Sequence, residues 1–265
     1  MNGRQWMRAA LAAVAAAGLL LAFRAPVAAT GGAAVAAAPS GEDILKKIDA
    51  NEVADTRYSS FTMTIARGGR QLKVLTMQAW VQGRDQAAIE VLSGPDKGTR
   101  YLKLGSDLWI ASREAEKPMK ISGHMLRQSM LDSDWSYEDT TNNKPLAERF
   151  NATVQAGETI SGRATWMLDL TAKSNDESYP RQTVWVDQQT YLPIRQQLKA
   201  LSGILLKTME FEDLRQVQGR WTPMKMTLRD VLKKDSSTVV TVQEIKFGVP
   251  IDPKILTLEF VENVH

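Results

Sequence analysis

Four carboxylates lie close together in the stretch MLDSDWSYED, residues 130–139, beside an indole and a phenol. Carboxylates spaced this closely could bind calcium or act as a pair of catalytic acids. An EF-hand loop that begins at Asp132 would need glycine at its sixth position and glutamate at its twelfth. The sequence has Tyr137 and Asn143 at those positions. The stretch therefore does not fit a calcium loop, and we interpret its acids as structural.

The other residue types that enzymes use are scarce. The chain has two histidines, His124 and His265, and no cysteine. A Ser-His-Asp arrangement would have to use His124, and no nucleophile-elbow motif accompanies it. RGGR (67–70) precedes a strand pattern rather than a helix, so it is not a phosphate loop, and a Cys/His metal site cannot be assembled. Carboxylate pairs that act without a metal stay open. We predict no enzyme activity, no catalytic residue, no metal and no cofactor.

The first 38 residues have the features of a secretory signal peptide followed by an Ala-rich segment. Arg4 and Arg8 precede an apolar run at 9–23, and small residues dominate from Ala25 to Ala38. Cleavage would leave the protein in the periplasm, and an uncleaved N-terminal anchor is the alternative. Without cysteine the exported chain has no disulfide and no residue to carry a bacterial lipid anchor.

The charge balance changes once this leader is removed. Three of the 33 basic residues lie in the leader, and no acidic residue precedes Glu42, so 30 basic and 30 acidic residues remain. A nucleic-acid-binding surface needs an excess or a stripe of basic residues. The sequence shows neither, which excludes nucleic acid as a partner.

Alternation of apolar and polar residues, which is typical of half-buried strands, begins near Tyr58 and dominates the rest of the chain. Ile44, Leu45 and Ile48 form one stripe of a predicted amphipathic helix over 41–55, and a second helix is predicted over 122–133. A turn or helical kink at 251–254 precedes LTLEFV (256–261). Strands are predicted at 61–65, 73–81, 87–92, 99–104, 107–112, 151–156, 164–173, 182–187, 191–199, 204–214, 221–231 and 238–247.

An antiparallel sheet of eleven or twelve strands must curl, and its concave face needs a cover. The apolar faces of so many strands exceed what two short helices can cover, and methionine side chains suit a surface that accepts varied apolar guests. We therefore predict a lipid-binding cavity, although an ordinary packed core is the alternative for many of these residues. The residues predicted to line the cavity are Met63, Met77, Ile89, Trp166, Leu168, Val184, Val186, Met209, Phe211, Met224, Met226 and Leu228.

Five stretches, in order along the chain, resemble the outer-membrane lipoprotein-sorting family, which is similar to the Lol-type periplasmic lipoprotein carriers. They are MLDSDWSYED, WVDQQTYLPIR (185–195), MEFEDL (209–214), GRWTPMKMTLRD (219–230) and IKFGVPIDPKILTLEFV (245–261). The resemblance spans roughly residues 42–262. The chain departs from the family at ASREAEKPMKIS (111–122), where the family usually has an aromatic residue and a proline before the lid.

The resemblance implies a mainly β fold, an unclosed antiparallel β-barrel of about 11 strands around a hydrophobic cavity, with helices as a lid. One lipoprotein-carrier-like domain would then occupy residues 41–265. MLDSDWSYED would join the lid to the returning sheet. The residues expected to form the lid are Met125, Leu126, Met130 and Trp135.

The function implied is that of a periplasmic carrier that binds the acyl chains of lipoproteins or lipids and moves them toward the outer membrane. Its partners would be the lipidated cargo, an inner-membrane exporter and an outer-membrane acceptor. Each methylene that leaves the membrane for water costs about 0.8 kcal/mol, so free transit of an acylated molecule is very unfavourable. The carrier needs an affinity for the chains only close to that of the membrane, so that partners can load and unload it. The alternatives are a carrier of free lipid or sterol-like molecules for a membrane exporter, and a non-catalytic periplasmic scaffold.

Overall fold

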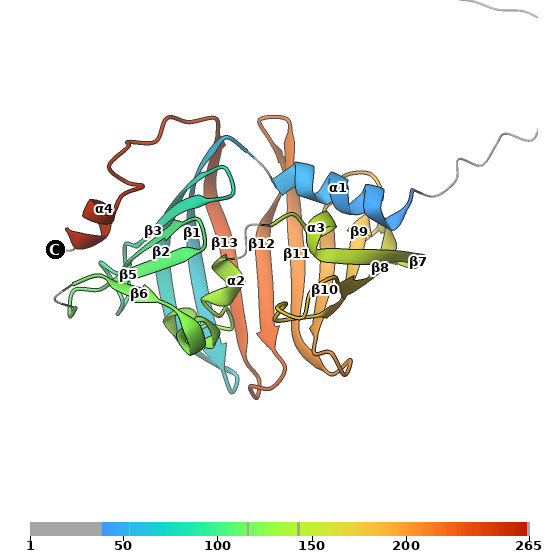
Figure 1. The fold of residues 1–265 in the computed structure, drawn as a ribbon, viewed down its shortest axis with the longest axis horizontal. Helices are drawn as coiled ribbons and strands as arrows, with labels where there is room; N and C mark the ends of the chain where they lie inside the picture. The colour runs from blue at the N-terminus through green and yellow to red at the C-terminus, as the bar shows by residue number, and fades with distance from the viewer. Residues whose placement is uncertain (1–38, 53, 116, 142–143, 264–265) are drawn as a thin grey trace, which may run out of the picture. The chain divides into compact units, whose positions relative to one another are not determined.

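The computed structural model describes residues 39–52, 54–115, 117–141 and 144–263. The predicted signal peptide lies outside the described residues. From Pro39 onward the described chain forms one compact unit, built on a single antiparallel sheet of thirteen strands (Figure 1). Within the described residues, no helix is long and apolar enough to cross a membrane.

The strands form two meanders, of which the first runs from the middle of the sheet to one edge and the second runs from the other edge back to the middle. The first six are β1 (Thr56–Arg67), β2 (Arg70–Gln82), β3 (Gln86–Val91), β4 (Arg100–Leu104), β5 (Asp107–Ala111) and β6 (Met119–Ile121). The other seven are β7 (Phe150–Ile160), β8 (Arg163–Ala172), β9 (Arg181–Asp187), β10 (Pro193–Lys199), β11 (Leu205–Val217), β12 (Arg220–Asp230) and β13 (Ser237–Phe247).

The order across the sheet is β6-β5-β4-β3-β2-β1-β13-β12-β11-β10-β9-β8-β7. The first and last strands of the chain therefore pair in the interior of the sheet, and β6 and β7 are its two edges. These edges do not pair with each other, so the sheet curls without closing (Figure 1). The predicted fold class is confirmed, with thirteen strands in place of eleven or twelve.

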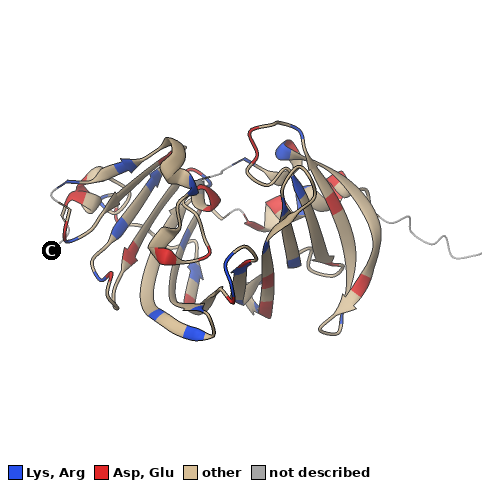
Figure 2. Cartoon of the chain, turned by 90° about the horizontal axis from the view of Figure 1, so that it is seen from below, with Lys and Arg blue, Asp and Glu red and all other residues tan. Residues whose placement is uncertain are grey.

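The turns and the strand surfaces follow the predicted patterning. Gly68 and Gly69 turn the β1–β2 hairpin with φ of 59° and 73°, a region that favours glycine. Basic and acidic residues are interspersed along the described strands and turns rather than gathered by sign (Figure 2), in keeping with the balanced charge of this part of the chain.

Helix α1 (Gly41–Glu52) covers the part of the sheet that ends at β7 (Figure 1). Ser40 caps its first turn, since the amide of Asp43 donates to Ser40 Oγ at 3.2 Å and the Ser40 hydroxyl donates to the Asp43 carboxylate at 2.6 Å. It ends at Glu52 rather than at the predicted residue 55. Its apolar stripe packs into one buried cluster with the inward face of the strands beneath it; the cluster consists of Ile44, Leu45, Ile48, Phe150, Leu168, Leu170, Val184 and Val186.

The chain must pass from one edge of the sheet to the other, and the described residues 122–141 and 144–149 of this connection, here called the lid segment, lie over the inward face. The segment contains the 3₁₀ helices η1 (Gly123–Arg127) and η2 (Met130–Asp132) and the short helices α2 (Glu138–Thr141) and α3 (Leu146–Arg149). The single helix predicted over 122–133 is wrong. Leu131 and Asp132 adopt φ of 56° and 62°, which ends the helical path, and Ser129 and Ser136 form a β-bridge.

A third cluster lies on the outward face of the sheet. LTLEFV contributes helix α4 (Leu258–Glu262), whose Val261 is fully buried against Ala88, Leu102 and Ala111. The side chain of Arg100 holds this helix by donating to the carbonyl of Phe260 at 2.7 Å. The outward face of β3–β5 is thereby covered, and the inward face is left to α1 and the lid segment.

Candidate functional site

The inward face of β1–β4 carries side chains in rows that run across the strands, because antiparallel partners directly opposite each other share a face. The first row is Arg57, Val81, Ala87 and Lys103. The second is Ser59, Ala79, Ile89 and Tyr101. The third is Phe61, Met77 and Val91, and the fourth is Met63 and Leu75. The wall therefore changes along the strands from charged to wholly apolar.

An apolar cavity of about 430 Å³ lies against this wall. Strands β12 and β13 close its second side with Met226, Val240 and Val242. The lid segment closes its third side with Met130 and Trp135. The cavity is thus bounded by both meanders of the sheet and by the connection between them.

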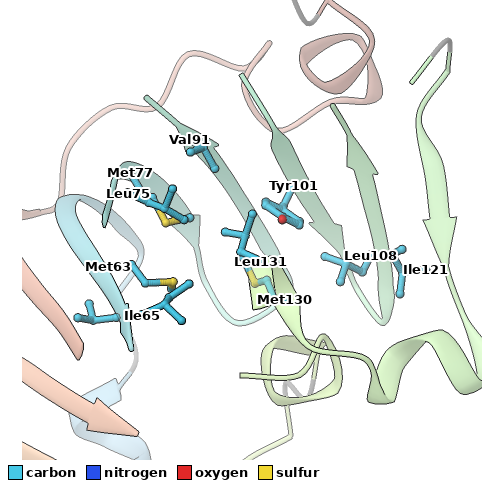
Figure 3. Close-up of a cluster of buried hydrophobic side chains, with 11 residues drawn as sticks. Met63, Ile65, Leu75, Met77, Val91, Tyr101, Leu108, Ile121, Met130 and Leu131 are labelled. Carbon is cyan, nitrogen blue, oxygen red and sulfur yellow. The ribbon is translucent and has the colours of Figure 1, made fainter. Parts of the chain in front are cut away.

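The deep end of the cavity is a packed core. Leu75 and Met77 are fully buried, and Ile65 is nearly so. Met130 and Leu131 of the lid segment lie between the strands that carry Met63 and Leu75 and those that carry Tyr101 and Leu108 (Figure 3). The lid therefore seals the apolar rows, whereas the row of Arg57 and Lys103 marks the other end.

Asp134 ties the lid segment to β13. Its side chain is 1% exposed and accepts a hydrogen bond from Thr238 Oγ1 at 2.9 Å and another from the hydroxyl of Ser236. Its own amide donates to Thr238 Oγ1 at 2.9 Å. A buried carboxylate with this set of donors is costly to pull away, because its partners would be left unsatisfied.

Two further acids of MLDSDWSYED hold cations of the sheet. Lys73 Nζ lies 2.8 Å from the carboxylate of Asp132, and this hydrogen bond lowers the pKa of Asp132. Lys207 Nζ lies 2.7 Å from the carboxylate of Asp139, which also accepts the amide of Ser136 at 2.8 Å. Within the described residues, no group of three or more acidic or histidine side chains is placed to hold a metal ion. These acids fasten the middle of the lid segment to β2 and β11.

Lys103 is the more buried of the two cations at the charged end. It is 8% exposed, and its Nζ donates to the carbonyl of Arg84 at 2.8 Å. Burial lowers the pKa of Lys103, and the charge of Asp85 acts in the opposite direction. Arg57 is half-buried on the edge of the same row. Both cations face the cavity.

A second cavity of about 530 Å³ lies on the other side of Trp135, which borders both. It is lined by paired charges, with Arg149 Nη2 at 2.6 Å from the Glu177 carboxylate and the Lys207–Asp139 pair beside it. Burial raises the pKa of Tyr179, which also faces this cavity, to about 12. This cavity is polar, and its charges already have partners.

The structure brings some of the predicted site residues together and separates others. Met63, Met77, Ile89, Met226, Met130 and Trp135 all line the apolar cavity. Met125 and Leu126 pack against the same buried cluster, and Leu126 also borders the polar cavity with Met209 and Leu228.

The remaining predicted residues lie elsewhere on the inward face. Trp166, Leu168, Val184 and Val186 belong to the cluster that α1 covers. Phe211 is the cross-strand partner of Met226, and Met224 is buried. A lipid-binding role for these residues stays a prediction.

The sequence reasoning missed the charged row. Alternate residues of a strand share a face. Arg57 lies two residues before the inward-facing Ser59, and Lys103 lies two residues after the inward-facing Tyr101, so both side chains face inward. The alternation of side chains could have predicted that both lie on the inward face. Their position in one row required the strand register.

A family model described as "-like: Uncharacterized protein" matches residues 83–263. No curated protein matches the chain. Among solved structures, the chain is similar to a DUF1329 family protein from Desulfovibrio piger, with 24% identity and a TM-score of 0.75, covering 82% of this chain and 95% of that one.

Two other solved structures share the fold. An outer membrane lipoprotein-sorting protein domain, so described, from Vibrio parahaemolyticus is 18% identical with a TM-score of 0.73, covering 84% of this chain and 98% of that one. A LolA superfamily protein from Nitrosomonas europaea is 22% identical with a TM-score of 0.68, covering 83% of this chain and 98% of that one. The predicted resemblance is confirmed: the chain belongs to the family that the matching model describes, and its structural neighbours are DUF1329 and LolA-superfamily outer-membrane lipoprotein-sorting domains.

Proposed function

We propose that this protein is a non-catalytic periplasmic carrier that binds acyl chains of lipoproteins or lipids and moves them toward the outer membrane. The observation that carries the proposal is the apolar cavity of about 430 Å³ between two halves of an open sheet and a lid. The shared fold of lipoprotein-sorting domains supports it. Residues 1–38 would direct export, and an inner-membrane exporter and an outer-membrane acceptor would load and unload the carrier.

The physical basis is reversible burial of hydrocarbon. A chain that leaves a membrane loses about 0.8 kcal/mol for each methylene exposed to water. Methionines at 63, 77, 130 and 226 line the cavity. Their unbranched, flexible side chains can follow chains of different shape. The cavity thereby offers an apolar environment comparable to the membrane interior, and partners can decide the direction of transfer.

Entry requires part of the lid segment to move. Asp134 and Asp139 fasten its middle to the sheet through buried hydrogen bonds and an ion pair. Helix η1, in contrast, has no buried residue. Segments with few buried contacts open at the lowest cost. We expect η1 to move while the two aspartates stay in place.

The direct test is mass spectrometry of organic extracts from the protein purified out of the periplasm. Acylated peptide would support a lipoprotein carrier, and free lipid would support the alternative lipid carrier. An empty protein, in a preparation that also fails to bind a fluorescent fatty acid, would overturn the proposal in favour of a scaffold. A Met226→Glu variant purified in parallel should lose the extracted ligand, and the secreted form should be shorter than the full chain by about 25 to 38 residues.

A further inference from the structure

The apolar cavity has one charged end. Arg57 and Lys103 belong to the same row of the sheet and are separated in that row by the small residues Val81 and Ala87. Three strand spacings of about 4.8 Å put their backbones roughly 14 Å apart. Both long side chains border the cavity. They are therefore placed to flank one small group between them.

The charge at this end is not balanced inside the cavity. Among the described residues that line it, Arg57 and Lys103 carry the charge, and none is Asp or Glu. Lys103 Nζ has three N–H donors, and one of them donates to the carbonyl of Arg84. The side chain of Arg57 makes no hydrogen bond or ion pair with another described residue.

The acidic residues that act on these two cations do not line the cavity. The charge of Glu52 acts on Arg57 from α1, but that side chain is 58% exposed and is paired with Arg84 at 3.6 Å. Asp85 acts on Lys103 from the β2–β3 turn. A cation that borders an apolar space gains most from an anion that shares that space, because little water is left to screen the pair. The charged end is thus complementary to an anionic group of a ligand in the cavity.

The volume of the cavity limits the rest of the ligand. A methylene group takes up roughly the 30 Å³ that a water molecule occupies in the liquid. A cavity of about 430 Å³ therefore holds about one chain of roughly 14 carbons. From Arg57 to Met63 the strand runs about 20 Å, at about 3.3 Å per residue, which gives such a chain room to lie along β1. Several chains of this length would exceed this volume.

We propose that the cavity takes a single-chain anionic amphiphile, with its headgroup between Arg57 and Lys103 and its chain running past Phe61 toward Met63. A long-chain carboxylate and a monoacyl phosphate ester share this chemistry. The inference rests on the proposed function, since it names the cargo class of the same cavity. It predicts that headgroup charge and chain number, as well as chain length, determine affinity.

The test is calorimetric titration of the mature protein with ligands that share one chain and differ in headgroup: tetradecanoate, tetradecyl phosphate, tetradecanol and tetradecyltrimethylammonium. The anions should bind at least about tenfold more tightly than the alcohol, because charge-assisted hydrogen bonds are stronger than neutral ones. The ratio between the two anions identifies the headgroup class. Affinity should rise about fourfold per methylene and level off near 14 carbons.

Variants assign the preference to the two cations. In the double variant Arg57→Gln/Lys103→Gln the anions and the alcohol should bind equally, with the alcohol within about twofold of its original affinity. Arg57→Gln alone should remove part of the preference and serves if the double variant does not fold. Arg70→Gln, at an exposed arginine in the hairpin at the opposite end of β1, is the charge-matched control and should leave the preference intact.

Three results would overturn the inference: equal binding of alcohol and anions by the parent protein, tighter binding of the cationic amphiphile, or equally tight binding of a two-chain phosphatidate. The proposed function fails separately, if none of the ligands, tetradecanol included, binds at all. A preference for anions that survives in the double variant would also contradict the placement of the headgroup.

Discussion

Introducing one carboxylate at two apolar positions distinguishes a cavity wall from a solid core. Leu168 is 0% exposed and packs beneath α1 with Ile44 and Leu45. In Leu168→Glu the new side chain would have to be protonated to stay buried. Holding a glutamate of pKa about 4.3 neutral at pH 7 costs roughly 4 kcal/mol. The lost burial of leucine adds about 2 kcal/mol. The expected loss, roughly 6 kcal/mol, is comparable to the whole stability of a small domain.

Met226 sits in a different environment, half-buried on the wall of the 430 Å³ cavity. In the ligand-free protein a glutamate at this position keeps its hydration, so Met226→Glu should cost only about 1 kcal/mol. A chain that enters must remove that water from the charge, at a cost of several kcal/mol. Binding of a fatty acid should therefore weaken at least about a hundredfold. Met226→Gln has nearly the same shape without the charge and should bind within about tenfold of the parent.

The assay pairs urea melts followed by tryptophan fluorescence with titration of a fluorescent fatty acid. The expected result is a large stability loss with Leu168→Glu and a small one with Met226→Glu, whose binding is abolished. Equal, severe destabilisation by both variants would show that Met226 lies in a solid core. A loss below about 2 kcal/mol with Leu168→Glu would show that α1 does not seal the other half of the sheet.

Three further predictions concern the lid, a close backbone contact and a buried phenol. Asp134→Ala removes the acceptor of two buried hydroxyls, so the free energy of unfolding in a urea melt should fall by about 2 to 3 kcal/mol and proteolysis within the lid segment should become faster. An unchanged urea midpoint would contradict the anchoring role of Asp134. Gly157→Ala would place a Cβ in steric overlap with the carbonyl oxygen of Thr165, so the strand must shift and the melting temperature should fall by several degrees. An unchanged melting temperature would refute this close contact. Burial raises the pKa of Tyr179 to about 12 from 10.0, so the protonated phenol stabilises the folded state fully below pH 10 and this contribution disappears between pH 10 and 12. Absorbance at high pH should show a phenolate transition near 12 that Tyr179→Phe removes, and loss of that proton at pH 10 would be the contrary result.

Sequence alternation located the strands well because most of them bury one face and expose the other. Strand β6 was missed because it has three residues, and the polar run before Met119 shows no alternation. The helix predicted over 122–133 failed for another reason. Met125, Leu126 and Met130 have helical spacing, yet each must reach the curved sheet beneath the lid, and tertiary packing overrides local preference.

The position of the cavity could not be predicted to the same extent. Alternation marks which side chains face inward, but not which part of the inward face another element fills. The stripe of Ile44, Leu45 and Ile48 fills the half that contains Leu168. The half that contains Met63 is covered by irregular backbone whose path depends on left-handed residues. The charged row also depends on the pairing of four strands, which composition does not reveal.

The pairing of β1 with β13 has a consequence for how the protein matures after synthesis. Met63 lies opposite Val240, near the other end of the chain. The two meanders can each form from local hairpins as the chain emerges, whereas this long-range pairing has to wait for the last strand. Val240 and Val242 of β13 also line the cavity. A chain whose synthesis has not reached β13 therefore lacks one wall of the cavity and exposes the apolar rows of β1 and β2, so we expect it to need protection from aggregation until β13 is present. The cavity is complete only after this final step.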